Sequence, residues 1–209
     1  MNRDRGGPPE RLVRATGNAG KLRELREILG PWNVDVRPQS EFTHAHAAET
    51  GLSFVENALL KARHAAGASG LPAIGDDSGL EVDALRGAPG IHSARYATPM
   101  ASDADNNLKL LDELAAVPAA ARGARYRCAM VYLRWPLDAA PLIAQAAWEG
   151  RILRAPVGVH GFGYDPLFEV AGTGRSAAQL DPAEKNRISH RGQALRALLL
   201  ALRATERPG

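Results

Sequence analysis

The chain has 209 residues, of which 45% are hydrophobic and 23% charged, a composition typical of a folded protein and not of a disordered one. This length suits one well-buried domain, which can divide into two lobes, and leaves little room for two independent domains. The net charge of +3 comes from 26 basic and 23 acidic side chains, and most arginines alternate with acids. Because nucleic-acid binding needs Lys and Arg clustered along one face, this balance argues against a nucleic-acid partner.

The single cysteine, Cys128, excludes an internal disulfide and fits a reducing compartment. No apolar stretch approaches the roughly 18 residues needed to span a bilayer, and the N-terminus lacks the apolar core of a signal peptide. We therefore expect a cytoplasmic protein without a membrane partner. Residues 1–10 are polar and rich in Gly and Pro, so we expect a flexible extension there, followed by a single two-lobed domain over residues 11–205.

The first predicted element is a short strand at residues 12–15. A helix follows over residues 22–29, where the apolar side chains recur at helical spacing. Gly30 and Pro31 end this helix, and the alternation of residues 34–36 predicts a second strand.

A second helix is predicted to begin at Ser53, because Glu56 stands three residues later in the spacing of a capping box. We expect it to run to about Ala66. The apolar residues 71–74 then form a short strand that leads into an acidic turn, and residues 80–85 form a separate strand beyond that turn.

The second half of the chain continues the alternation of helices and strands. A helix is predicted over residues 106–116, and two long strands over residues 124–135 and 142–152. Asp181, followed by Pro182 and Glu184, starts another helical region, and a last amphipathic helix extends past residue 195. The fold class is therefore α/β, and the two long strands favour a mixed sheet over a purely parallel one.

Three groups of residues carry chemistry. The first is a glycine loop between the first strand and the first helix, formed by Thr16, Gly17, Asn18, Ala19, Gly20 and Lys21. Glycines let the backbone approach an anion, and the helix N-terminus and a lysine supply positive charge, so phosphate is the natural ligand. The loop is not a P-loop, because it has two residues, and not four, between the first glycine and the Gly-Lys pair. The alternative is a plain turn.

The second group is an acidic turn in which Asp76 and Asp77 stand between Gly75 and Gly79. Adjacent carboxylates repel each other, so one pKa rises or a cation is recruited. Oxygen ligands of this kind suit Mg²⁺, and Glu49 is a plausible further ligand. The alternative is a solvated acidic turn with no function.

The third group combines an aromatic turn with a basic helix start. Phe162 and Tyr164 lie in a glycine-permitted turn with Asp165, where an exposed ring can stack on a nucleobase, although aromatics more often fill the core. Further along, basic and hydroxyl side chains stand beside the start of the last helix, namely Lys185, Ser189, His190 and Arg191. Cations there oppose the helix dipole, so they are better explained by an anion or a carbonyl-bearing base.

Taken together, these residues resemble the inosine triphosphate pyrophosphatase family, which includes the bacterial dITP/XTP pyrophosphatases. The matching segments lie in the same order along residues 11–203, at 15–21, 49–51, 56–62, 76–82, 87–90, 93–96, 161–166, 184–185 and 188–192. The departures are small: Gly75 stands where the family often has Ala, and His160 precedes Gly161 where small or polar residues are common.

The resemblance implies an elongated two-lobed α/β fold with a long central mixed β-sheet flanked by helices, a homodimer and a Mg²⁺ cofactor. It places the triphosphate on residues 16–21 and Lys61, and the metal on Glu49 and Asp77, with Asp76 in support. It also implies that Phe162 stacks on the base. The remaining expected substrate contacts are Ser78, Gly163, Tyr164, Asp165, Lys185, Ser189, His190 and Arg191.

The implied reaction is Mg²⁺-dependent hydrolysis of non-standard purine nucleoside triphosphates (dITP, ITP and XTP) to the monophosphate and pyrophosphate. Such an enzyme would keep deaminated purines out of DNA and RNA. Asp77 is the expected catalytic residue, which orients or deprotonates the attacking water. Two alternatives stay open: a pyrophosphatase for pyrimidine or modified nucleotides, and a non-catalytic nucleotide- or RNA-binding module suggested by the basic isoelectric point.

Overall fold

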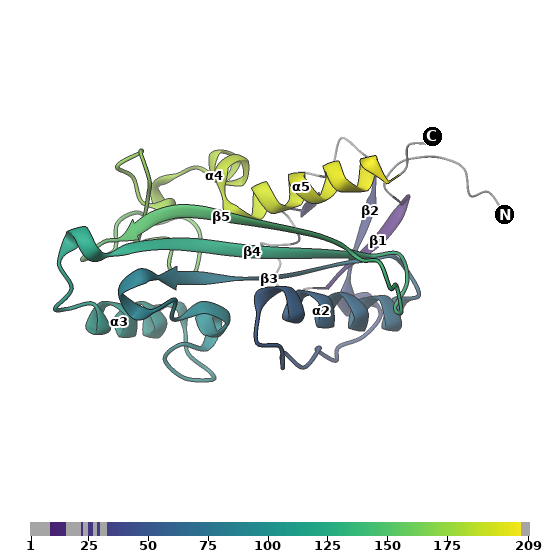
Figure 1. Ribbon diagram of the computed structural model, residues 1–209, viewed down its shortest axis with the longest axis horizontal. Helices are drawn as coiled ribbons and strands as arrows, with labels where there is room; N and C mark the ends of the chain where they lie inside the picture. Colours follow the sequence, from purple (N-terminus) through teal and green to yellow (C-terminus); the bar gives the residue numbers. More distant parts are fainter. Residues whose placement is uncertain (1–8, 16–21, 23–24, 27–28, 30–32, 206–209) are drawn as a thin grey trace. The chain divides into compact units, whose positions relative to one another are not determined.

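The secondary structure alternates between strands and helices, as the sequence predicts. The computed structural model describes residues 9–15, 22, 25–26, 29 and 33–205 (Figure 1). Its principal elements are β1 Arg11–Arg14, β2 Asp35–Pro38, α2 Phe54–Ser69, β3 Ala73–Val82, α3 Asp103–Glu113, β4 Gly123–Leu133, β5 Leu142–Ile152, β6 Phe168–Val170, α4 Pro182–Ile188 and α5 His190–Ala204. None of the helices in the described part of the chain is long and apolar enough to cross a membrane.

Six strands form one mixed sheet in the order β2-β1-β3-β4-β5-β6. Strand β1 pairs in parallel with β2 and with β3, whereas β5 and β6 are antiparallel. The expected α/β class and mixed sheet are therefore confirmed.

The chain forms two compact units. The first contains residues 1–77, 129–145 and 192–209, and the second contains residues 78–128 and 146–191. Strands β3, β4 and β5 each contribute residues to both. Residues 1–8 of the expected N-terminal extension lie outside the described residues.

In the first unit, the contact between α2 and the strands is rich in alanines. Small side chains from α2, among them Ala58 and Ala62, pack against Ala129, Val131 and Leu133 of β4 with no exposed surface. Such residues let a helix lie close to a sheet, because there is little side-chain bulk between the two backbones. This close packing is what brings polar groups of α2 to the strands.

The second unit has a core with more aromatic residues. Leucines of α3 meet Tyr126, Trp148 and Phe168 from β4, β5 and β6. Helices α3 and α4 lie on opposite sides of these strands in Figure 1. The ring centroids of Tyr126 and Phe168 are 4.7 Å apart, a separation typical of favourable aromatic pairs.

The predicted elements before the acidic segment are largely confirmed. Strands β1 and β2 lie within a residue or two of their expected bounds. Of the first predicted helix, residues 22, 25, 26 and 29 are described, and all four are helical. Ser53 caps α2 by accepting the Glu56 backbone N–H. The Glu56 carboxylate accepts from the N–H of Leu52, and not from that of Ser53 as an ideal capping box would require.

The acidic segment is not a turn, and this prediction was wrong. Residues 75–79 lie in the middle of β3, a continuous ten-residue strand from Ala73 to Val82. Of the predicted strand over residues 80–85, residues 80–82 are the end of β3, whereas Asp83–Leu85 form a 3-10 turn. Glycines and aspartates suggested a turn, but cations from neighbouring elements meet the carboxylates, so the strand continues through them.

The later elements follow the predictions closely. Strands β4 and β5 match the two long predicted strands within two residues. Helix α3 begins three residues earlier than expected, because Ser102 and Asp105 form a capping box that the sequence reading missed. Asp181 caps α4 and Pro182 occupies its first turn, as predicted. The side chain of Glu184 pairs with Arg175.

The turn between β4 and β5 is organised by one buried carboxylate. Asp138 is 1% exposed and accepts from the Arg134 backbone N–H at 3.1 Å and from the Ala140 N–H at 3.0 Å. The Arg134 guanidinium donates at 2.8 and 2.6 Å. Because hydrogen bonds from Arg134 stabilise the charged form, the pKa of Asp138 lies well below its usual value.

We expect Asp138→Ala to lower the free energy of unfolding by about 1–3 kcal/mol at neutral pH, towards the lower end because Arg134 is half exposed. A carboxylate with a depressed pKa stabilises the fold above its unfolded-state pKa, and that contribution is lost as the pH falls. The difference in stability should therefore begin to shrink as the pH falls below about 4 and keep shrinking towards the depressed folded-state pKa of Asp138. Denaturant unfolding at several pH values measures this. Asp112→Ala, at an exposed site on α3, should change stability by less than about 0.5 kcal/mol.

Candidate active site

The first cluster of functional side chains contains two carboxylates that share one lysine. Lys61 of α2 places its Nζ atom 2.7 Å from Asp77 Oδ1 and 3.0 Å from Glu49 Oε1. All three residues belong to the first unit. The side chains of Lys61 and Asp77 are 17% and 9% exposed, whereas that of Glu49 is 34% exposed. The sequence predicted this association of Glu49, Lys61 and Asp77, which we call the acid–lysine cluster.

Close packing of α2 on β3 makes the cluster possible. A Cβ atom at Gly75 would lie 2.4 Å from the Ala58 carbonyl oxygen and 2.6 Å from the Ala62 nitrogen, so glycine permits this approach. Side chains alternate across a strand, and Asp77 therefore points to the same face as Gly75, towards α2. Lys61 lies one residue before Ala62 and reaches this carboxylate directly.

Asn57 links the loop that carries Glu49 to the strand that carries Asp77. Its side chain is fully buried, its Oδ1 accepts the Gly51 N–H at 2.9 Å, and its Nδ2 lies 3.4 Å from Asp77 Oδ2. The amide thus bridges two parts of the cluster. The sequence predicted a helix over Asn57 but gave this residue no role. The only indication of this role in the sequence was an amide side chain one helical turn before Lys61.

The ionisation of Asp77 reflects opposing effects. Burial raises its pKa most strongly, the ammonium of Lys61 lowers it, and Glu49 and Asp76 raise it again, so that the net shift is upward. For Lys61, burial is the largest single effect and lowers the pKa, but the combined attraction of the acids outweighs it and the net shift is also upward. Asp77 is consequently a stronger base than an exposed aspartate, held beside a charged lysine.

Asp76 has a different environment from its neighbour. In the strand it points to the opposite face from Asp77, where Arg14 of β1 donates to its Oδ1 at 2.5 Å. Both side chains have no exposed surface. The expected support of the metal by Asp76 would therefore be indirect. Arg14 is a second residue that the sequence reading missed, since it stands in what looked like an ordinary strand.

A divalent metal fits the acid–lysine cluster as a two-carboxylate site. Glu49 and Asp77 supply oxygen ligands, and no three His, Cys, Asp or Glu side chains of the described residues are grouped for a closed metal site. Mg²⁺ is commonly bound by one or two carboxylates, with water and substrate phosphates completing its shell. The donor set is of this open type.

The expected phosphate loop, residues 16–21, lies outside the described residues. Its two flanks are described. Strand β1 ends just before it, with the Ala15 N–H donating to the Ile74 carbonyl at 2.9 Å, and Leu22 beyond it is helical. The predicted strand–loop–helix order is therefore consistent with both flanks.

The second cluster belongs to the second unit and surrounds the ring of Phe162, which is 38% exposed. The Lys185 ammonium lies 4.8 Å from the ring centroid, and the Arg191 guanidinium carbon lies 5.6 Å from it. Asp165 Oδ2 accepts from Lys185 Nζ at 2.5 Å and from the Phe162 N–H at 2.8 Å. The structure thus brings together four of the residues that the sequence expected to read a base. We call them the Phe162 cluster.

Ring stacking and hydrogen bonds hold the side chains around this cluster in place. The His190 ring stacks on Tyr126 at 4.7 Å with an interplanar angle of 7°. Tyr126 also donates to Asp165 Oδ1 at 3.3 Å, and its pKa is raised well above the usual value, mainly by burial. Arg191 donates from Nη2 to Ser78 Oγ at 3.0 Å. Tyr126 is a further residue that the sequence did not single out, since it stands between Arg125 and Arg127 in a predicted strand.

Two residues that were expected to contact the substrate make contacts within the fold. Tyr164 is 3% exposed, belongs to the core of the second unit, and donates from its hydroxyl to the Ser93 carbonyl at 2.8 Å. Ser189 is buried at the end of α4, and its N–H donates to the Lys185 carbonyl at 2.8 Å. Substrate contacts by these two side chains stay predictions.

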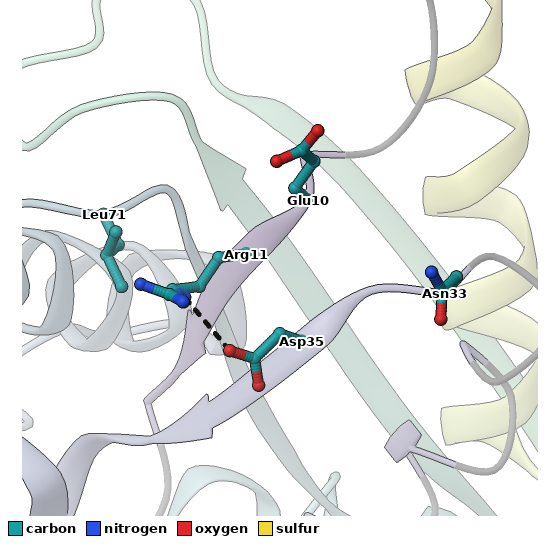
Figure 2. Close-up of a pocket in the computed structure, with 5 residues that line it drawn as sticks. All are labelled: Glu10, Arg11, Asn33, Asp35 and Leu71. Atoms are coloured by element: carbon teal, nitrogen blue, oxygen red, sulfur yellow. Dashed lines mark hydrogen bonds and ion pairs between the residues drawn. The ribbon is translucent and has the colours of Figure 1, made fainter.

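A surface depression of about 510 Å³ lies elsewhere in the first unit. It is lined by Glu10, Arg11, Asn33, Asp35 and Leu71, and Figure 2 shows the ion pair between Arg11 and Asp35 at 3.0 Å within it. None of these residues belongs to either cluster. Asp35 in this depression already pairs with Arg11, and their side chains are 48% and 57% exposed, so the less exposed acid–lysine cluster is the better candidate.

Comparisons with known proteins agree on one family. The model of the Ham1 family matches residues 12–201. The dITP/XTP pyrophosphatase of Thioalkalivibrio sulfidiphilus is 58% identical over 189 residues, covering 90% of this chain and 96% of that protein. The one of Escherichia coli O157:H7 is 55% identical over 194 residues, covering 93% and 98%.

Solved structures give the same answer. A HAM1 protein from Coxiella burnetii has 48% sequence identity and a TM-score of 0.86, covering 92% of this chain and 98% of that one. A nucleoside-triphosphatase / dITP/XTP pyrophosphatase from Mycobacterium abscessus has 40% identity and a TM-score of 0.74, covering 90% and 98%.

We expect Lys61→Met to raise the pKa of Asp77 further, because the variant removes the charge that lowers it. Titration of carboxyl carbons by NMR, with the Asp77 signal identified by its loss in Asp77→Asn, measures this shift. Lys109→Met, which removes a lysine of α3, should leave the Asp77 midpoint where it is. A midpoint that moves to lower pH in Lys61→Met would contradict the electrostatic description of the cluster.

Proposed function

Because this chain belongs to the Ham1 family, we propose that it is a nucleoside-triphosphate pyrophosphatase that converts dITP, ITP and XTP to the monophosphate and pyrophosphate. The observation that carries the proposal is the acid–lysine cluster, in which Glu49 and Asp77 face one lysine in a largely buried setting. Carboxylates so arranged suit a metal-assisted reaction on a polyphosphate. The close relatives that are named for this reaction supply the substrate class.

Mg²⁺ is the proposed cofactor, with Glu49 and Asp77 as its ligands. When bound, the ion would neutralise phosphate charge and polarise the phosphorus that is attacked. Lys61 is proposed to contact the phosphates, since a buried lysine between two acids can turn towards a more highly charged partner. Residues 16–21 are proposed to hold the remainder of the triphosphate on backbone N–H groups and Lys21.

Asp77 is proposed to orient the attacking water and to accept its proton. The water oxygen forms a bond to the α-phosphorus, the bond from that phosphorus to the α–β bridging oxygen breaks, and pyrophosphate leaves. The raised pKa of Asp77 suits this role, because a stronger base gains more from accepting a proton. Asn57 lies beside the other carboxylate oxygen and would hold Asp77 in orientation.

The Phe162 cluster is proposed to read the base. The exposed ring of Phe162 would stack on a purine, and Arg191 or His190 would donate to the 6-keto oxygen. Adenine carries an amino group there, which donates and would leave these donors unpaired. Such a mismatch can be worth several powers of ten in specificity.

Three further proposals rest on the family resemblance. The enzyme would keep deaminated purines out of DNA and RNA, it would act in the cytoplasm, and it would be a homodimer. The order of the motifs and the identity to the named relatives support these proposals. Light scattering of the purified protein tests the dimer directly.

An RNA-binding module is the less favoured alternative. Many described arginines pair with acids, as Arg125 does with Asp83 and Glu149, and Arg151 with Glu169, so their charge is offset locally. Such a module would also place Glu49 and Asp77 where they repel a phosphate. A pyrophosphatase for pyrimidine or modified nucleotides uses the same catalytic groups and differs only in the base that it accepts.

The central experiment measures pyrophosphate release from dITP, XTP, dATP, dGTP and dCTP, with and without Mg²⁺, and identifies the monophosphate by chromatography. We expect rapid release from dITP and XTP only with the metal. Equal rates with all five substrates would defeat the base assignment, and orthophosphate release would mean attack at the terminal phosphorus. Asp77→Asn should lower kcat by about 10²–10⁴-fold, whereas Asp112→Asn should retain full activity.

We expect Phe162→Ala to raise the KM for dITP by about 5- to 100-fold, the equivalent of losing one stacked base. Phe42 is the matched control, because it is 37% exposed against 38% for Phe162 and belongs to the first unit. Phe42→Ala should leave KM unchanged. Equal effects of the two substitutions would show that Phe162 acts through general stability and not through the base.

A further inference from the structure

Side chains of helix α3 bind the loop that carries Phe162 at a single residue, Gly163. Asp103 in its first turn accepts the Gly163 N–H at 2.6 Å, and Asn107, one turn later, donates from Nδ2 to the Gly163 carbonyl at 2.9 Å. Both polar backbone groups of Gly163 are thus bound by side chains of the same helix. All of these residues belong to the second unit.

The contacts fix the backbone next to the stacking ring. Gly163 has a φ of +62°, in the left-handed region that glycine adopts most readily. Phe162 directly precedes it and has its own N–H bound to Asp165 at 2.8 Å. Two successive residues of the loop are therefore anchored, one from α3 and one from Asp165, while the ring between these anchors remains 38% exposed.

Stability alone explains Asn107 poorly. Its Oδ1 atom is buried and has no hydrogen-bond partner in the described part of the structure. A buried acceptor without a partner costs free energy, whereas an apolar side chain of similar shape would avoid that cost. What Asn107 contributes is the amide donor that holds Gly163.

We propose that Asp103 and Asn107 are positioning residues for base recognition, which hold Gly163 so that the Phe162 ring is preorganised to stack on a purine. This inference rests on the proposed function, because it assigns how the base-binding part of that site is built. An ordered ring loses less conformational freedom on binding, so affinity for the base increases without any new contact.

Calorimetric titration with two probes tests the proposal. One probe is dIMP, which has a purine, and the other is inorganic tripolyphosphate, which has none. We expect Asn107→Leu to weaken dIMP binding by about 2- to 10-fold, the effect of one lost hydrogen bond, and to leave tripolyphosphate binding unchanged. Denaturant unfolding of the same variant measures its stability separately, where removal of the unpartnered oxygen and loss of the donor to the Gly163 carbonyl have opposite effects.

Further variants sharpen the test. Asp103→Ala should weaken dIMP binding, whereas Asp103→Asn keeps an acceptor for Gly163 and should restore it. In a Phe162→Ala background, Asn107→Leu should have no further effect, because the ring that it positions is gone. Asp112→Asn on the same helix is the control with no expected effect. Equal weakening of both probes, or an Asn107→Leu effect that persists without Phe162, would overturn the proposal.

The outcome is separable from that of the proposed function. Absence of pyrophosphate release from every triphosphate would refute the enzymatic reaction. The positioning of Gly163 is visible without nucleotide, as protection of its amide proton from exchange with solvent. That protection should be lost in Asp103→Ala and kept in Asp103→Asn, and equal protection in both would contradict the proposed role of α3.

Discussion

Two neighbouring carboxylates lie inside a buried strand, and the arrangement depends on a cation at each face of that strand. Arg14 meets Asp76 on one face, and Lys61 meets Asp77 on the other. An unpaired charge buried in this way would be very costly, and removing one partner of such a pair usually costs several kcal/mol. The strand therefore continues through a segment whose composition is that of a turn.

The ion pair between Lys61 and Asp77 also belongs to the proposed catalytic site. Lys61 is shared between Asp77 and Glu49, so three charged groups lie together before any ligand binds. A bound metal would bring positive charge and a polyphosphate negative charge. The carboxylates could then contact the metal in place of Lys61, and Lys61 could contact the phosphates in place of the carboxylates. Burial keeps the pKa of Asp77 raised despite the lysine, and a base of this kind is suited to accepting a proton from water.

The proposed base site is built differently, from hydrogen bonds to a loop backbone. Asp165 binds the Phe162 N–H, and α3 binds both polar groups of Gly163. Asp77 and Lys61 project from a strand and a helix, whereas the Phe162 ring projects from a loop that side chains hold in place. Loops tolerate change better than the elements they connect, so specificity for the base can vary while the chemistry is kept.

The sequence by itself determined the α/β class, the long strands β4 and β5, the caps of α2 and α4, and the groups of residues proposed to carry the chemistry. These features follow from local patterns of apolar spacing and capping, which need no knowledge of distant contacts. Only the tertiary structure decided that the acidic segment is a strand and that Asp76 and Asp77 point to opposite faces. It also revealed the contacts of Asn57 and Arg14 with the acidic strand and the hydrogen bonds from α3 to Gly163. The reason is physical: each of these features depends on a partner brought near by folding, and neither local propensity nor spacing along the chain records that partner.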